Sequence, residues 1–247
     1  MSKFKNKLKI VWKNFWECFV HSLTPGIMYF LAGAVLLYVL AKMEEDVDMS
    51  KLTTWAIVVG VIAVAYHGLL MWAHGGSHFE MLVSGNMKRR SSNYGEELHI
   101  SSHKIWKEYR PWKGFLSGFF TSVPLIIGAI VFGANAEEIS STADTLGRGL
   151  GIAVIVFDLL AGWVLLPFQM SARLGANVNF YLLMLFALLQ IAVSGGLYIA
   201  GAYSRRAKRI REQEIAAKAA AAEAEARNRP KKINYGGLPG TKPRKRK

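Results

Sequence analysis

Five separate apolar stretches of the chain are each long enough to cross a lipid bilayer. They cover Pro25–Ala41, Leu52–Ala73, Gly114–Ala134, Gly149–Met170 and Phe180–Tyr203. At about 1.5 Å rise per residue, about 20 helical residues match a hydrocarbon core of about 30 Å. Because a backbone in lipid must satisfy its own hydrogen bonds, we expect these stretches to be helices. The sequence therefore predicts an all-α, polytopic helical membrane bundle over residues 25–203.

The length of the sequence limits what else it can contain. The bundle takes residues 25–203 of 247, and the remaining residues are too few for a soluble catalytic domain of about 100–150 residues. Any chemistry is therefore expected inside the bundle or on its short loops. Cys18 is the one cysteine, which excludes an internal disulfide and a cysteine-based metal site.

The segments on either side of the bundle are polar and basic. Residues 1–24 predict an amphipathic helix that lies on the membrane, with Phe15 and Phe19 on the apolar face and Lys13 and Glu17 on the polar face. Residues 204–227 are rich in alanine and charge, which predicts a solvated helix. Residues 228–247 combine prolines, glycines and basic residues, which is typical of a disordered tail.

The distribution of lysine and arginine predicts the orientation of the chain. It places the N-terminus and the basic loop 75–113 in the cytoplasm, and the acidic loops 43–50 and 135–147 outside. Five complete crossings would then put the basic C-terminal tail outside, against the same rule. Three solutions to this conflict are open: the tail is exported, the N-terminus is outside, or one of the five stretches does not cross.

We favour the third solution, and the fourth stretch is the one that we expect not to cross. It contains Asp158, Gly162 and Pro167, which suit a broken or re-entrant helix buried by protein. The N-terminus, loop 75–113 and the C-terminal tail are then all predicted to be cytoplasmic.

Polar side chains in the last two stretches form the first candidate site. Asp158 and Gln190 lie near the middle of stretches joined by a short linker, so we expect them at similar depth, with Ser194 on the same face as Gln190. A charged carboxylate at mid-bilayer is costly, so Asp158 is expected to be neutral or partnered. Two interpretations stay open: a hydrogen-bonded clip between helices, or a protonation or cation-coupling site of a transporter or channel.

Histidines form the second candidate site, because imidazoles four residues apart on a helix can share a metal ion. They are His67, His74, His78, His99 and His103. Two features oppose a metal: Gly75-Gly76 is expected to break the helix after His74, and His103 lies among cationic side chains. Packed or interfacial histidines are the favoured interpretation, and we expect no cofactor.

Small residues recur at every fourth position of two stretches, which predicts faces for helix contact. They are Gly114, Gly118 and Ser122 in the third stretch, and Ala192, Gly196 and Ala200 in the fifth.

The net charge of +14 is concentrated in basic patches, and two interpretations stay open. The favoured one is topological anchoring of the spans, and the other is contact of the tail with anionic lipid, RNA or an acidic partner. The residues expected to bind such a partner are Arg205, Arg206, Lys208, Arg209, Lys245, Arg246 and Lys247. The favoured function is that of a non-enzymatic scaffold or accessory component, surrounded by lipid and assembled with a protein partner or a second copy of the chain. The alternatives are a transporter or channel subunit that uses Asp158 and Gln190, and a membrane enzyme with a histidine-bound metal.

Overall fold

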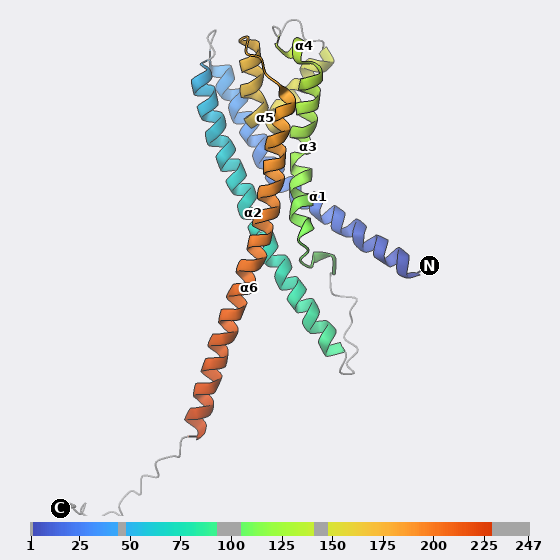
Figure 1. The fold of residues 1–247 in the computed structure, drawn as a ribbon, viewed down its shortest axis with the longest axis vertical. Coiled ribbons are helices and arrows are strands. Elements are labelled where there is room, and N and C mark those ends of the chain that lie inside the picture. The colour runs from blue at the N-terminus through green and yellow to red at the C-terminus, as the bar shows by residue number, and fades with distance from the viewer. Residues whose placement is uncertain (1, 44–47, 93–104, 141–147, 229–247) are drawn as a thin grey trace, which may run out of the picture. The chain divides into compact units, whose positions relative to one another are not determined.

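The computed structural model describes residues 2–43, 48–92, 105–140 and 148–228, and every regular element in these ranges is helical (Figure 1). The elements are α1 (Ser2–Lys42), α2 (Met49–Ser92), η2 (Ile105–Lys107), α3 (Trp112–Ala134), α4 (Ala136–Ser140), α5 (Arg148–Arg173), η4 (Phe180–Leu183) and α6 (Met184–Asn228). Five helices, α1, α2, α3, α5 and α6, are long and apolar enough to cross a membrane. The predicted all-α protein with five such helices is confirmed, and it is compatible with an integral membrane protein.

The chain divides into two units, residues 1–206 and residues 207–247. The first unit holds the helical bundle. The second unit holds the end of α6. The predicted disordered tail falls almost wholly on residues 229–247, which lie outside the described residues.

Side-chain contacts give the direction of the helices in the bundle. α1 and α2 are antiparallel, because Tyr29 lies beside His67 while Leu36 packs with Leu52. α3 and α6 are antiparallel as well. A Cβ on Gly114 would contact Tyr198, at the start of α3, and Phe132 packs on Phe180 near its end.

α2 and α6 run parallel, and they approach each other closely through two glycines. A Cβ on Gly75 would overlap the backbone carbonyl oxygen of Tyr198, and a Cβ on Gly201 would overlap that of Trp72. Each helix thus presents a glycine to the backbone of the other, as small residues do at close helix contacts.

The expected helix break at Gly75-Gly76 is wrong, because α2 continues through both glycines to Ser92. Packing against α6 explains the difference, since the glycines serve the contact between helices rather than a turn. Residues 75–92, predicted as part of a loop, are therefore helical. α1 likewise continues through Pro25, where the sequence predicted a separate span to begin. The interfacial position of residues 1–24 stays a prediction.

α5 bends sharply, although it is one helix by its backbone hydrogen bonds. Along a straight helix, Asp158 and Gln169 would be about 16 Å apart. With the Gln169 amide oriented to satisfy both of its partners, it donates to Asp158 Oδ2 at 3.0 Å and accepts from Arg173 at 3.1 Å. Gly162 and Pro167 both lie between the two paired residues, where the helix bends. Pro167 has no backbone N–H, so one hydrogen bond of the helix is missing there.

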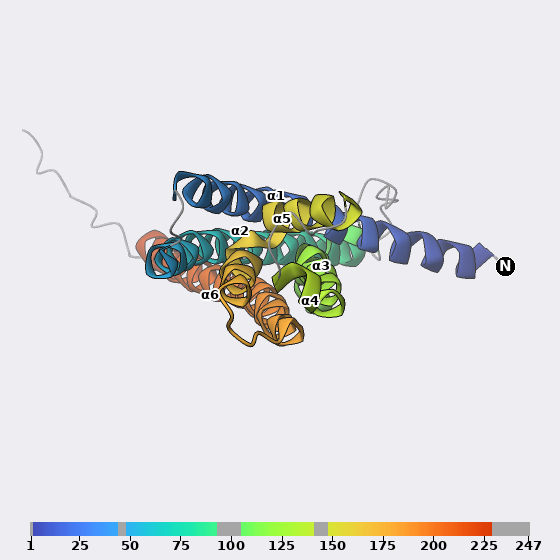
Figure 2. The ribbon, with the colours of Figure 1, turned by 90° about the horizontal axis from the view of Figure 1, so that it is seen from above.

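The end of α5 contacts α4, the helix that precedes α5 in the sequence. The Arg173 Nε atom donates to the carbonyl oxygen of Ile139 in α4 at 3.3 Å. In Figure 1 the yellow start and the gold end of α5 both lie toward the end of the bundle that carries α4. Figure 2 shows α5 between α1 and α3. On one side its Leu159 carbonyl group lies against Gly33 of α1, and on the other its Leu165 packs on Gly128 of α3.

Local signals explain where two of the helices begin and end. Asp48 precedes α2, and its Oδ1 accepts a hydrogen bond from the Lys51 N–H at 3.1 Å, as an N-cap does. After α5, Gly175 has a φ of 89°, a value that favours glycine. The Gly175 N–H donates to Ala172 and the Ala176 N–H donates to Ser171, which is the Schellman arrangement.

The contact face predicted on the third stretch is confirmed, and the face predicted on the fifth is wrong. On α3, Gly118 lies against Ser194, and Ser122 donates to Gln190 of α6. On α6, however, nothing lies within 4 Å of the position that a Cβ on Gly196 would take, and Ala192 and Ala200 are exposed like it. Two residues correspond to about 200° around a helix, so this stripe faces away from the Gln190–Ser194–Tyr198 face that makes the contact.

Candidate functional site

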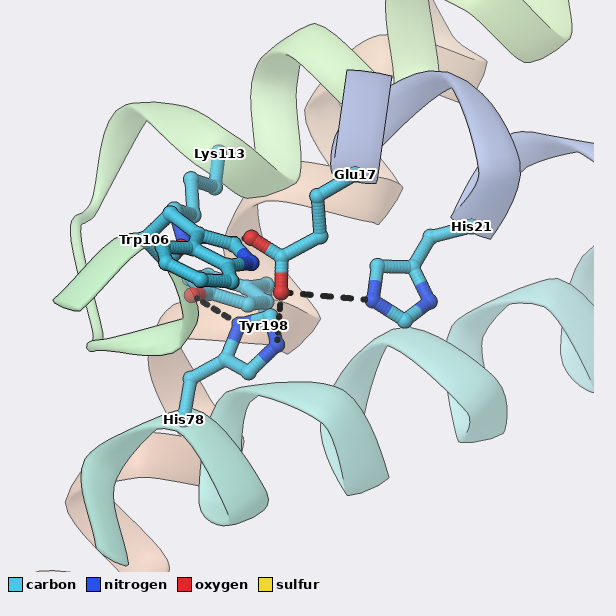
Figure 3. Close-up of polar contacts among 6 residues, drawn as sticks. All are labelled: Glu17, His21, His78, Trp106, Lys113 and Tyr198. Carbon is cyan, nitrogen blue, oxygen red and sulfur yellow. Dashed lines mark hydrogen bonds and ion pairs between the residues drawn. The ribbon is translucent and has the colours of Figure 1, made fainter. Parts of the chain in front are cut away.

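Glu17 of α1 lies at the centre of a polar cluster where α1, α2, α3 and α6 meet (Figure 3). Its Oε2 atom is 2.8 Å from the Nζ atom of Lys113, the second residue of α3. The side chain of Lys113 is only 2% exposed, and Nζ also donates to the carbonyl oxygen of Trp106 in η2. Since both charges are removed from water, each depends on the other for compensation.

Two histidines approach the other oxygen of the same carboxylate. The Nε2 atom of His78 on α2 is 3.3 Å from Glu17 Oε1, and the Nε2 atom of His21, one turn further along α1, is 3.8 Å from it. His78 is held in turn by α6, because its Nδ1 atom is 2.8 Å from the hydroxyl oxygen of Tyr198. Figure 3 shows both imidazole rings pointing toward Oε1.

A cavity of about 510 Å³ reaches this cluster. Glu17 and His21 form part of its wall. The other lining residues are Trp12, Lys13, Trp16, Val20, Trp106 and Lys107. The Lys13 ammonium lies 3.8 Å from the centre of the Trp106 ring, which is a cation–π contact. The cluster is therefore open on one side to a space with aromatic and basic walls.

Tyr109, between η2 and α3, closes the cluster on another side. Its ring stacks on Tyr198 with 5.4 Å between ring centres, and its N–H donates to the carbonyl oxygen of His78 at 2.9 Å. Burial, followed by the nearby Tyr203, raises the pKa of the Tyr109 hydroxyl above its ordinary value. Tyr109 is thus a neutral phenol at physiological pH and contributes no charge to the cluster.

Of the histidines that the sequence grouped, His74 and His78 lie near each other in the structure, and His67 lies apart from them. His67 lies deeper in the bundle, with its Nδ1 atom 3.2 Å from the Tyr29 hydroxyl. The ring of His74 lies 4.0 Å from that of His21 and is tilted by 51° to it, and it lies 6.2 Å from the ring of His78. His99 and His103 lie outside the described residues.

The candidate pair Asp158 and Gln190 has other partners in the structure. Asp158 is paired with Gln169 of the same helix, as described above. Gln190 accepts a hydrogen bond from Ser122 at 3.0 Å. Ser194 donates to the carbonyl oxygen of Gly114 at 2.7 Å. All three side chains are buried, and their hydrogen bonds join α3 to α6 or stabilise the bend of α5.

The candidate basic residues lie at the end of the apolar part of α6. Arg205 pairs with Glu80 of α2 at 2.7 Å, while Arg206 is exposed. In the second unit, Lys208 is exposed and Arg209 is half-buried. The remaining candidates, Lys245, Arg246 and Lys247, lie outside the described residues.

The sequence did not identify the central residues of the cluster. Glu17 was predicted on the wet face of an interfacial helix, and this is wrong, because its side chain is 8% exposed. A signal existed: Glu17 and His21 are four residues apart on α1, and His74 and His78 are four apart on α2. What the sequence cannot supply is the alignment of α1 with α2, which brings the two pairs together.

Comparison with known proteins gives no match: no family model, no curated protein and no solved structure matches this chain.

Proposed function

We propose that this chain is a non-enzymatic membrane component that presents a basic helix and tail to an anionic partner on the cytoplasmic side. Four helices, α1, α2, α3 and α6, would cross the membrane, and α5 would be re-entrant.

The bend of α5 supports a re-entrant segment. Its polar groups are satisfied inside the protein by the Asp158–Gln169 and Gln169–Arg173 hydrogen bonds, which is the condition for irregular helices at membrane depth. The contact of Arg173 with Ile139 supports a return of the chain to the side from which it came. Four crossings would then bring residues 1–24 and Arg205 to the same side, as the excess of lysine and arginine favours.

The observation that carries the proposed function is the second part of α6. The helix continues past Tyr203 to Asn228, which adds about 37 Å of helix. From Arg206 to Asn228 only Arg209 is half-buried, and every other residue is exposed. Basic residues concentrate at its beginning, between Arg205 and Arg211, where no acidic residue interrupts them. A solvated helix with charge at one end is suited to contact an anionic surface.

Binding experiments on the full-length protein in nanodiscs of neutral lipid test this function. The probes are vesicles with anionic lipid, single-stranded RNA and an acidic protein, each at low and high salt. We expect binding that weakens with salt, since counterions are released on contact. The variant Arg206→Gln/Arg211→Gln should bind anionic vesicles about thirtyfold more weakly, at about 1 kcal/mol for each cation. Lys208 is left in place because it pairs with Glu212 at 4.0 Å.

The variant Lys218→Gln/Arg227→Gln is the matched control, because it removes the same charge further along the same helix. We expect this variant to lose less binding to anionic vesicles, because Glu223 and Glu225 already reduce the positive electrostatic potential of that part of the helix. Equal losses in the two variants, or no binding of any probe at low salt, would contradict the proposal.

A second candidate function, movement of protons or cations, is favoured by one observation. Buried polar contacts occur in several parts of the bundle: the Glu17 cluster, the Tyr29–His67 contact, the Ser122–Gln190 bond and the Asp158–Gln169 bond. Ionisable groups inside a membrane protein are candidates for an ion path. Proton flux into liposomes that falls on Asp158→Asn would support this function, and flux that is absent or unchanged would exclude it.

A further inference from the structure

We propose that Glu17, His21 and His78 bind one divalent transition-metal ion, for which Zn²⁺ is the best fit. This site goes beyond the proposed function, because neither the topology nor the basic helix requires it. It also differs from the set of histidines that the sequence suggested.

The separation of the donor atoms fits a tetrahedral ion. At metal–ligand distances of about 2.0–2.2 Å, the edge of a coordination tetrahedron is about 3.4 Å. His78 Nε2 and His21 Nε2 lie 3.3 and 3.8 Å from Glu17 Oε1. One ligand atom from each of the three residues lies within 4.8 Å of the others. The His21 Nε2 atom, at 3.8 Å from Oε1, has to approach by about 0.4 Å to reach the edge of the tetrahedron.

The outer hydrogen-bond partners of His78 and Glu17 contact the far atom of each side chain, which leaves the atom that faces the site available to a metal ion. Tyr198 contacts Nδ1 of His78, so Nε2 faces the centre of the site. Lys113 binds Oε2 of Glu17, so Oε1 faces the centre as well. An outer partner that fixes the far nitrogen of a ligating imidazole is usual in zinc sites. The site therefore has both the donors and the groups that orient them.

The inward oxygen of Glu17 supplies an independent observation. Oε1 is buried, and its near neighbours, His78 Nε2 at 3.3 Å and His21 Nε2 at 3.8 Å, do not make a hydrogen bond of normal geometry with it. A buried carboxylate oxygen without a donor is costly, and a bound cation would satisfy it. Lys113 already balances the charge of Glu17 through Oε2. The ring centres of His21 and His78 are 5.5 Å apart, so one ion between the two imidazoles can reach both.

The fourth coordination position faces the cavity. Glu17 and His21 belong to the wall of the 510 Å³ space, so water or a small anionic ligand can reach an ion held between them. Two imidazoles, one carboxylate and an open position form a donor set that catalytic zinc sites use. The soft thiolate of a cysteine is not required, which agrees with a preference for Zn²⁺ over Cu⁺.

Metal titration of the full-length protein in detergent tests the site. The protein is purified through an affinity tag without histidines, stripped with a chelator, and titrated with Zn²⁺ and with Co²⁺. We expect one ion per chain, and visible d–d absorption of tetrahedral Co²⁺ with nitrogen and oxygen ligands. His21→Gln and His78→Gln should each weaken binding at least tenfold, and Tyr198→Phe should weaken it about 10–100-fold by releasing His78.

His67→Gln is the matched control, because it removes a buried histidine of α2 outside the set, and it should bind normally. Thermal unfolding is a second measurement, which controls for misfolded variants. Zn²⁺ should raise the unfolding midpoint of the wild type and not that of His78→Gln, because an ion that binds only the folded state stabilises that state. A stripped wild type that binds no stoichiometric ion would overturn the proposal. So would a His21→Gln/His78→Gln variant that binds as well as the wild type.

Discussion

Gly75→Ala tests the close contact between α2 and α6. The new Cβ would overlap the carbonyl oxygen of Tyr198 and would lie 2.8 Å from its carbonyl carbon. Carbon atoms in good contact are about 3.5–4.0 Å apart, so the helices must separate by about 1 Å at this point. Because the obstacle is backbone, no side-chain rotation relieves it. Overpacking of this kind costs about 1–3 kcal/mol of unfolding free energy.

Gly196→Ala is the control that isolates this overlap. Gly196 is also inside a helix, but nothing lies within 4 Å of its Cβ position. Both substitutions gain the same helix propensity, about 0.5–1 kcal/mol, because alanine loses less backbone entropy than glycine. The difference between the two variants is therefore the overlap alone, and Gly75→Ala should be less stable than Gly196→Ala by about 1–3 kcal/mol.

The assay is unfolding of the purified protein in mixed micelles with rising dodecyl sulfate, followed by tryptophan fluorescence. Gly201→Ala should be as harmful as Gly75→Ala, because its Cβ would overlap the Trp72 carbonyl oxygen in the reciprocal way. Equal stability of Gly75→Ala, Gly201→Ala and Gly196→Ala would refute the reasoning that these glycines are required by packing.

Three further predictions concern stability in the same assay. Asn14 is fully buried, and both polar atoms of its side chain lack a hydrogen-bond partner among the described residues, so Asn14→Leu should stabilise the protein by about 1–3 kcal/mol. Lys113→Met should destabilise it by about 3–5 kcal/mol, because Glu17 is left charged and buried; adding Glu17→Gln should recover part of that loss, and full additivity would contradict the ion pair. Gly175→Ala should cost about 1 kcal/mol, since φ is 89° there, and an unchanged unfolding midpoint would contradict the role assigned to this cap.

The number and type of the helices follow from the sequence because they depend on local properties. Uninterrupted apolar stretches of sufficient length specify helices in a lipid environment, whatever their neighbours are. The contact face of α3 is also a local pattern, and Gly114 and Gly118 do lie against α6. Its partner face on α6 was assigned to the wrong stripe, because small residues occur on two faces and the sequence does not say which face has a neighbour.

The polar cluster required information that is not local. Glu17 and Lys113 are 96 positions apart, and His78 and Tyr198 are 120 positions apart. Viewed alone, Glu17 continues a polar face with Lys13, so solvent exposure is the natural expectation. Burial follows only once α2 and α3 pack against α1 and supply His78 and Lys113. The same holds for Gly75-Gly76, whose role depends on a helix that appears over a hundred residues later.

The ion pair between Glu17 and Lys113 imposes an order on the biosynthesis of this chain. Glu17 leaves the ribosome long before Lys113, the residue that neutralises it, because the two are 96 positions apart in the sequence. Until α3 follows, Glu17 of α1 lacks the cation that compensates its charge in the folded protein. We therefore expect this part of the nascent α1 to stay in contact with water until Lys113 can bind it. Its final docking is coupled to the arrival of α3, so a mid-chain helix completes the placement of the first.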